Sequence, residues 1–248
     1  MDTVEAFAPY MNARVSGMRS KLFAKNHLED LVNLYDVAKM TDDLLQSPYQ
    51  QEMAEALTRA KGVDAIEEAV SRNMVNAQQA LSRMAAGPLQ DLTDRFLMRW
   101  DLSAVKALLR MRHHGLDAQT GLPTMAPGPN LTVTLMKSFA ERTTMEELVS
   151  ALVAWKPELC GPLAGAIVEY RQQQNTLAVL EDALDRGYFV RNVSALRSRE
   201  AEDSRLLRKV LRMEIDRINV RILLQLRNGH ASADQLAARL LPSGWLNE

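Results

Sequence analysis

The sequence predicts an all-α protein built from two related helical units, and three observations support this prediction. Signals that begin and end helices recur along the 248 residues, whereas alternating strand patterns are almost absent. One helical pattern occurs twice, in residues 94–112 and again in residues 209–227. A shorter match, of residues 66–75 with residues 180–189, precedes it in the same order and at nearly the same offset. We therefore expect a duplicated helical bundle.

The repeated pattern keeps the residue type at six positions with the same spacing in both copies. These are Asp101, Val105, Lys106, Leu108, Leu109 and Arg112 in the first copy and Asp216, Val220, Arg221, Leu223, Leu224 and Arg227 in the second. The offset is longer than the roughly 20–50 residues of a solenoid repeat. Each unit is therefore expected to be a small, three-helix-bundle-like body. We place the units at 1–129 and 130–248, because the Gly/Pro-rich stretch 115–129 is the best boundary between them.

Capping patterns place the individual helices. Ser47 with Gln50, Thr144 with Glu147, and Ser232 with Gln235 each resemble a capping box at a helix start. Glycine or proline residues at 61–62, 87–88, 156–157 and 160–162 indicate helix ends. Residues 131–135 alternate like a strand, but no sheet partner is apparent, so we interpret them as a helix start. The helices expected are 3–24, 27–45, 48–60, 65–85, 89–113, 131–141, 145–155, 163–186, 200–228 and 233–240.

Bulk properties narrow the class of protein. The net charge of −1 gives no overall attraction to nucleic acid or to an anionic membrane. Cys160 is the only cysteine, which excludes an intramolecular disulfide and fits a reducing compartment. The first residues include Asp2 and Glu5 where a signal peptide would be basic and apolar, and no apolar run reaches the roughly 18–20 residues of a membrane span. We expect a cytoplasmic protein.

The repeated helix carries a carboxylate on its expected buried face. At about 100° per residue, Asp101 shares an arc with Val105 and Leu108, and Asp216 does so in the second copy. A buried carboxylate is costly unless it is paired or hydrogen-bonded, so each Asp is expected to fix the crossing of another helix. Arg14 is the candidate partner of Asp101, and Arg212 of Asp216. The alternative is that both Asp residues are solvated.

The opposite side of the first copy carries a ridge of four cations within an arc of about 60°. We call these residues the cationic ridge: Arg95, Arg99, Lys106 and Arg110. Such a ridge suits an acidic partner surface. It is alternatively a solvated face balanced by acidic neighbours, for which the candidates are Asp42, Asp43, Glu52 and Glu55.

The usual signatures of catalysis and cofactor binding are absent from the sequence, which has no Gly-rich phosphate loop, no His-Glu-x-x-His and no paired cysteines. His113 and His114 point about 100° apart on a helix and do not readily share a metal. Cys160 has no base nearby and is expected to be a buried thiol. We therefore expect no enzyme activity, no cofactor, no metal and no small-molecule substrate. A helical enzyme with a site assembled from scattered charged residues remains an alternative.

Several motifs, in order, resemble the family of C subunits (also called d subunits) of V-type and archaeal-type rotary ATPases. Residues 10–15, Tyr-Met-Asn-Ala-Arg-Val, are similar to the family's Tyr-x-x-Ala-Arg-Val opening, and residues 44–49 are similar to its Leu-x-x-Thr-x-Tyr segment. Residues 242–246, Pro-Ser-Gly-Trp-Leu, are similar to its Pro-Gly-Gly-x-Leu element. The duplicated helix is similar to the family's recurrent Asp-x-x-Asn-Leu-Lys-x-x-x-Arg helix through Asp101, Val105, Lys106, Arg110 and Gly115 in one copy and Asp216, Asn219, Val220 and Arg221 in the other. The copies depart from it at Ala104 and Gln225.

The resemblance implies a non-catalytic rotor component, a funnel-like body on the cytoplasmic face of the proteolipid ring that receives the foot of the central shaft. It would couple ATP turnover to proton or sodium transport and lie peripherally on the membrane through the ring. Its structural residues would be Arg14, Asp101, Asp216, Asn219 and Arg227. Two units are present where the family has three, which would leave the funnel open. The alternative function is a general helical scaffold or adaptor.

Overall fold

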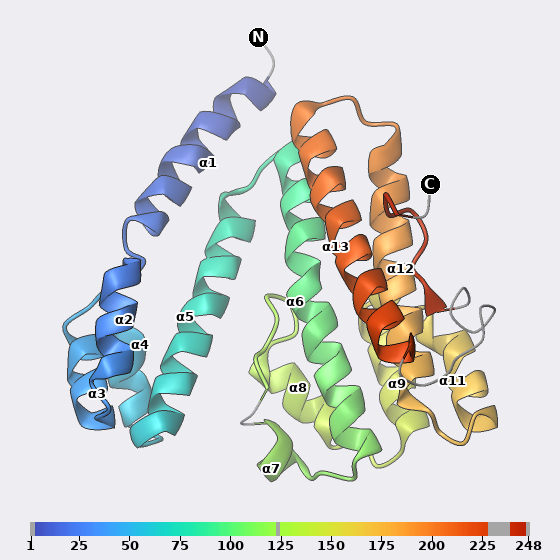
Figure 1. The fold of residues 1–248 in the computed structure, drawn as a ribbon, viewed down its shortest axis with the longest axis horizontal. Coiled ribbons are helices and arrows are strands. Elements are labelled where there is room, and N and C mark those ends of the chain that lie inside the picture. Colours follow the sequence, from blue (N-terminus) through green and yellow to red (C-terminus); the bar gives the residue numbers. More distant parts are fainter. Residues whose placement is uncertain (1–2, 123–124, 228–238, 247–248) are drawn as a thin grey trace. The chain divides into compact units, whose positions relative to one another are not determined.

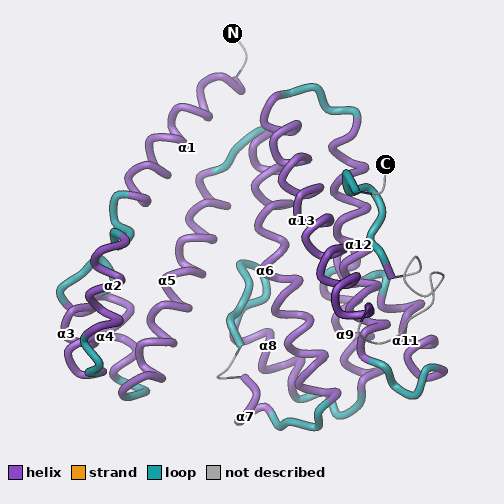
Figure 2. The backbone as a smooth tube through the Cα atoms, in the orientation of Figure 1, coloured by secondary structure: helices purple, strands orange, loops and turns teal. Residues whose placement is uncertain are grey.

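The structure is a computed structural model that describes residues 3–122, 125–227 and 239–246. Within these ranges every regular element is a helix, as predicted, and no strand occurs (Figures 1 and 2). The long helices are α1 (Thr3–Arg19), α5 (Gly62–Met84), α6 (Pro88–His113), α12 (Leu177–Arg197) and α13 (Glu202–Arg227). The shorter helices are α2 (Lys25–Asn33), α3 (Val37–Leu45), α4 (Gln50–Leu57), α7 (Ala118–Gly121), α8 (Val133–Ala140), α9 (Met145–Trp155), α10 (Pro157–Cys160) and α11 (Leu163–Gln172).

The chain forms two compact units, residues 1–97 and residues 98–248, and the division falls inside α6. This division differs in position from the expected boundary at 129. The two compact units are therefore not the two expected sequence repeats, and the repeat boundary at 129–130 stays a prediction.

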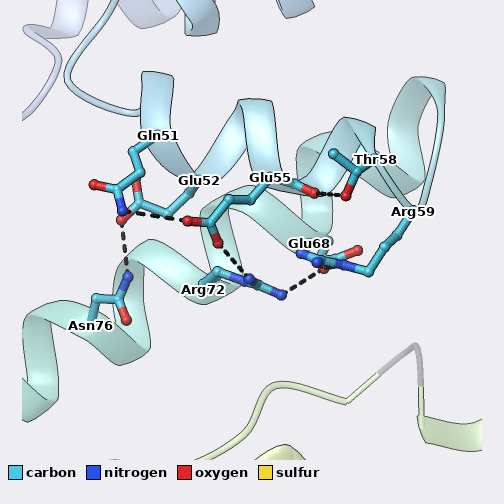
Figure 3. A network of polar contacts seen from close by, with 8 residues as sticks. All are labelled: Gln51, Glu52, Glu55, Thr58, Arg59, Glu68, Arg72 and Asn76. Carbon is cyan, nitrogen blue, oxygen red and sulfur yellow. Dashed lines mark hydrogen bonds and ion pairs between the residues drawn. The ribbon is translucent and has the colours of Figure 1, made fainter.

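The first unit has a small core where α3, α4 and α5 pack together (Figure 1). Met53, Ala56, Ala65 and Ala69 are fully buried there, and Leu44 lies beside them. Three of these five residues are alanines, which let α4 and α5 approach closely. A charged network closes over this contact, because Arg72 of α5 binds Glu55 of α4 at 2.7 Å and Glu68 at 2.9 Å (Figure 3).

The second unit is organised around α12, which packs against α10, α11 and α13. Seven of its residues are buried: Leu180, Leu184, Tyr188, Phe189, Asn192, Val193 and Leu196. Burial raises the pKa of Tyr188 to about 12, so this phenol stays neutral inside the core. Beside α12, α13 runs along the part of α6 that belongs to this unit (Figures 1 and 2).

Several helix boundaries differ from the prediction. Expected helix 27–45 is two helices, because Tyr35 adopts a left-handed φ of 48° and Asp36 caps α3. Expected helix 163–186 is broken at Gln174 and Asn175, which both have positive φ. The second part, α12, continues through Gly187 to residue 197. A side chain is not tolerated at Gly187, because its Cβ would lie 2.4 Å from the Pro162 ring. The short helices α7 and α10 were not predicted.

Of the three predicted capping boxes, one is present, one is absent and one lies outside the described residues. Thr144 and Glu147 form the predicted capping box at the start of α9. Ser47 does not cap α4, since its hydroxyl accepts a hydrogen bond from Tyr49 N in the turn before the helix. Thr132 caps α8, so the segment at 131–135 leads into a helix as interpreted. Ser232 and Gln235, with most of the expected helix 233–240, lie outside the described residues.

Candidate functional site: two anchored loops

Asp101 lies in the middle of α6, is fully buried, and holds a loop that follows α6 by its backbone. Its Oδ1 accepts hydrogen bonds from the backbone N–H groups of Asn130 and Leu131, each at 3.0 Å. Its Oδ2 accepts one from the Asn130 side chain at 2.8 Å and pairs with Lys156 Nζ at 3.0 Å. A buried carboxylate with this many donors is satisfied, and removing it would leave Lys156 and two backbone donors without their acceptor.

Asp216, at the equivalent position in α13, holds a loop at the same sequence distance. It accepts hydrogen bonds from the backbone N–H groups of Trp245 and Leu246, both at 3.2 Å. The separations of 29 and 30 residues are those found between Asp101 and its two backbone donors. We call residues 127–131 and 242–246 the anchored loops. Their sequences, Pro-Gly-Pro-Asn-Leu and Pro-Ser-Gly-Trp-Leu, align at the offset that relates the two helices.

Each anchored loop needs a glycine where it passes over its carboxylate. A Cβ on Gly128 would lie 2.2 Å from Asp101 Oδ1, and a Cβ on Gly244 would lie 2.2 Å from Asp216 Oδ1. The glycine sits one position later in the second loop, where Ser243 adopts a left-handed φ of 74°. The loops thus share their hydrogen bonds and differ in the backbone path that leads to them.

Other groups strengthen the second loop. Asn219 is buried in α13, and its side chain accepts a hydrogen bond from Leu241 N at 2.8 Å and donates one to Leu241 O at 2.9 Å. Arg212, the candidate partner of Asp216, donates to Gly244 O at 3.2 Å and lies over the Trp245 ring. The first copy has Ala104 in place of Asn219, so this two-point clamp exists once.

The cationic ridge meets its acidic partners within the chain. Lys106 pairs with Asp185 of α12 at 2.5 Å, Arg110 binds Glu181 of α12 at 2.6 and 2.9 Å, and Arg99 pairs with Glu214 of α13. The fourth cation, Arg95, binds Asp91 one turn back at 2.8 Å. Three of the four ridge cations therefore pair with the chain's own helices α12 and α13, and binding of the ridge to a partner protein stays a prediction.

Three of the four acidic residues suggested as neighbours of the ridge have other partners. Asp43 binds His27 at 2.8 Å, Glu52 accepts from Asn76 at 3.0 Å, and Glu55 binds Arg72. Arg72 and Gln51 together hold the pKa of Glu55 below its usual value (Figure 3). These contacts belong to the first unit, where those of Glu52 and Glu55 fix α4 on α5 and that of Asp43 joins α3 to α2.

Two of the other predicted residues have different outcomes. The expected partner of Asp101 was Arg14, whereas the structure pairs Asp101 with Lys156; Arg14 Nε lies 3.5 Å from Met84 Sδ. The side chain of Arg227 lies outside the described part of the structure. Sequence reasoning missed Lys156, Asn130 and Gly128. The position of the first anchored loop could have been inferred from the sequence, because its first proline and its leucine match those of the second loop.

The described residues hold no group of three or more His, Cys, Asp or Glu side chains that would bind a metal ion. Burial raises the pKa of the Cys160 thiol to about 12, which keeps it protonated and unreactive. A shallow groove of about 490 Å³ lies between α9 and α11 and is lined largely by small apolar side chains, with Glu146 and Arg171 paired beside it. No helix among the described residues is long and apolar enough to cross a membrane.

Comparison with known proteins gives consistent relatives. The C subunit of the A-type ATP synthase of Methanococcoides burtonii is 26% identical over 237 residues, which cover 95% of this chain and 63% of that protein. The corresponding protein of Methanosarcina barkeri is 27% identical with the same coverage, and that of Haloquadratum walsbyi is 28% identical over 230 residues, 92% of this chain and 65% of that protein. The chain thus spans a little under two thirds of the length of these relatives.

The family described as ATP synthase (C/AC39) subunit matches residues 11–248, a range that contains both anchored loops. This match covers nearly all of the chain and includes the duplicated helix from which the resemblance was inferred. The chain therefore belongs to the ATP synthase (C/AC39) subunit family.

Proposed function

We propose that this chain is a non-catalytic component of the central stalk of a rotary ATPase, which couples the central shaft to the proteolipid ring in the membrane. Membership of the ATP synthase (C/AC39) subunit family over residues 11–248 is the observation that carries the proposal. In this role the chain would act as a peripheral protein held on the cytoplasmic face of the membrane by the ring. It would transmit torque and bind neither nucleic acid nor a small-molecule substrate.

The anchored loops support a torque-transmitting role because such a body must resist shear between its helices. Asp101 ties α6 to the loop before α8 and, through Lys156, to the junction of α9 and α10. The ion pairs of Lys106 and Arg110 with α12, and of Arg99 with α13, resist sliding of α6 along these helices. The pairs of Lys106 and Arg99 have limited exposure and are therefore geometrically demanding, so they favour one packing over slightly shifted ones.

Reconstitution of the complex tests this proposal. The tagged chain is co-expressed with the shaft proteins and the proteolipids of its own genome, and each is tested separately and together for co-purification from detergent. We expect the chain to retain both the shaft and the ring. Failure to retain either would contradict the rotor assignment and favour a scaffold that serves another assembly.

A variant extends the test to coupling. Asp101→Asn removes the charge beside Lys156 while keeping the side-chain shape, so we expect the complex to assemble and its stalk to be less rigid. The measured quantity is the ratio of ATP-driven ion uptake to ATP hydrolysis in vesicles. The exposed substitution Arg142→Gln serves as the control. An unchanged ratio in Asp101→Asn would argue against a torque-bearing role for the anchor.

A further inference from the structure

The equivalent helices α6 and α13 differ in what covers them. On α6, Val105 and Leu109 are fully buried. Their counterparts on α13 lie on an open face, where Val220 is 43% and Leu224 is 60% exposed. The same helical face, repeated in sequence, is thus buried in one copy and uncovered in the other.

The uncovered residues of α13 form a continuous stripe. Leu206, Met213 and Val220 are spaced seven residues apart, and Leu224 follows one turn later, so all four project to the same side. Leu206 and Met213 are 61% and 60% exposed. We call these four residues the α13 stripe. Large apolar side chains aligned at this spacing are typical of a helix that packs against a second helix.

Cations flank the stripe and specify the charge of what covers it. Arg217 and Arg221 are exposed on the same face, with Lys209 and Arg205 nearer the start of the helix. From residue 204 to residue 224 the only carboxylates are Glu214, paired with Arg99, and Asp216, which holds the second anchored loop. A second copy of this chain, stripe against stripe, would bring cations together, so charge disfavours a homodimer.

The first copy shows which carboxylates its cations bind. Lys106, the counterpart of Arg221, pairs with Asp185 of α12, and Arg110 one turn later binds Glu181. These two carboxylates are four residues apart on one helix, beside its buried residues Leu180 and Leu184. A helix with carboxylates at this spacing beside apolar residues would offer partners to Arg221 and an apolar seam to the α13 stripe.

We propose that the α13 stripe is a docking surface for an acidic amphipathic helix of a partner protein, which places two carboxylates four residues apart beside an apolar seam, as α12 does. Arg221 binds one of these carboxylates in the way that Lys106 binds Asp185. The stripe's apolar side chains supply most of the buried area, and Arg217 and Arg221 set the register and orientation. This inference stands independently of the rotor assignment.

A peptide with the sequence of residues 177–197, labelled with a fluorophore, is the probe because it carries Glu181 and Asp185 at the required spacing. Its binding to the full chain is followed by fluorescence anisotropy. We expect Arg221→Glu to weaken binding by at least about tenfold, because like charges would then face each other. A peptide with both carboxylates changed to Arg is expected to bind Arg221→Glu better than it binds the wild type.

The controls make the result decisive. Arg142→Glu changes an exposed cation outside the stripe and is expected to leave binding unchanged, whereas Leu224→Glu is expected to abolish it. Absence of binding would overturn the proposal. Equal binding to the wild type and to Arg221→Glu would also overturn it, because a peptide that takes the place of the chain's own α12 on α6 does not depend on Arg221. Sedimentation that shows a dimer lost in Leu224→Glu would identify a second copy as the occupant and would also overturn it.

Discussion

At the scale of single residues, the chain uses one device twice, a carboxylate in a helix that accepts hydrogen bonds from backbone N–H groups 29 and 30 residues later. The two versions differ in burial. Asp101 is fully buried and paired with Lys156, whereas Asp216 is partly exposed and has longer hydrogen bonds. The hydrogen bonds of Asp101 should therefore contribute more to stability than those of Asp216, because a hydrogen-bonding group left unpaired away from water is costly in free energy.

The two Asp→Ala variants test this inequality. Asp101→Ala is expected to lower the free energy of unfolding by roughly 3–5 kcal/mol, because it leaves the Lys156 ammonium and two backbone donors unpaired in the interior. Asp216→Ala is expected to cost about 1–2 kcal/mol, since water can reach the freed donors. Urea unfolding measured by circular dichroism gives both values. Equal losses would show that burial does not distinguish the two anchors.

The glycines above the anchors give a second pair of variants. A Cβ on Gly128 would lie 2.8 Å from the backbone N and Cα of Asp101, whereas a Cβ on Gly244 would meet mainly side-chain atoms. We expect Gly128→Ala to cost about 1–3 kcal/mol and Gly244→Ala to cost less, because side chains move more easily than helix backbone. Gly165, inside α11 with nothing within 4 Å of an added Cβ, is the control.

Gly165→Ala is expected to raise the free energy of unfolding by roughly 0.5–1 kcal/mol through helix propensity. Thermal unfolding of the three variants under one set of conditions ranks them. A Gly128→Ala protein as stable as the wild type would mean that the first loop does not need its close approach to α6.

At the scale of elements, the sequence was most informative where the pattern was local. The capping box of Thr144 and Glu147 and the all-helical class follow from spacing within one turn, and the structure has both. The breaks at Tyr35 and at Gln174–Asn175 were missed because no glycine or proline marks them, although all three residues adopt positive φ. The expected helix end at residue 186 was the opposite error, since α12 continues through Gly187, where a glycine allows the close approach to Pro162.

At the candidate site, too, the sequence did not show which residues would meet across helices. Helical geometry placed the ridge cations on one face, but it contained no information about which helix would lie opposite. The partners of Arg99, Lys106 and Arg110 are 71 to 115 residues away in sequence. Asp101 was expected to be buried, yet its partner Lys156 lies at the end of α9, and that pairing depends on how α6 and α9 meet.

The pair between Lys106 and Asp185 gives a pH-dependent prediction at this scale. Burial raises the pKa of Asp185 above its ordinary value of 3.8, although Lys106 opposes the increase. A raised pKa in the folded state means that the folded chain binds this proton more readily than the unfolded chain. The contribution of Asp185 to stability therefore falls as pH rises through the range between the ordinary and the raised pKa.

Lys106→Met removes the opposing charge, so the pKa of Asp185 is expected to rise further and the variant to lose about 3 kcal/mol at neutral pH. The loss is expected to shrink as the pH falls, since protonation of Asp185 removes the uncompensated charge. Urea unfolding at pH 7 and at about pH 5 measures the difference. The double variant Lys106→Met with Asp185→Leu should recover most of the stability at both pH values; a loss that is the same at both would contradict the assignment.

At the scale of the whole molecule, two kinds of division coexist. The sequence repeats at an offset of 115 residues, and the repeated anchors lie on α6 and α13. The compact units meet instead at residues 97 and 98 inside α6, so the second unit holds both anchors while the first unit has a core of its own. A single helix therefore belongs to both units, and the anchored loops belong to one of them.

If each compact unit has its own core, local opening should stay within a unit. Met53 is fully buried between α4 and α5, and Met53→Ala is expected to cost roughly 2–5 kcal/mol through lost burial and the cavity left behind. Native-state hydrogen exchange should then speed up for amides of α3, α4 and α5, whereas amides of α9, α11 and α12 keep their wild-type rates. Leu152→Ala, at a fully buried position in α9, should produce the reverse pattern. Exchange that rises equally across all these helices in either variant would mean that the chain opens as one cooperative body. The division inside α6 would then separate two compact units that do not unfold independently.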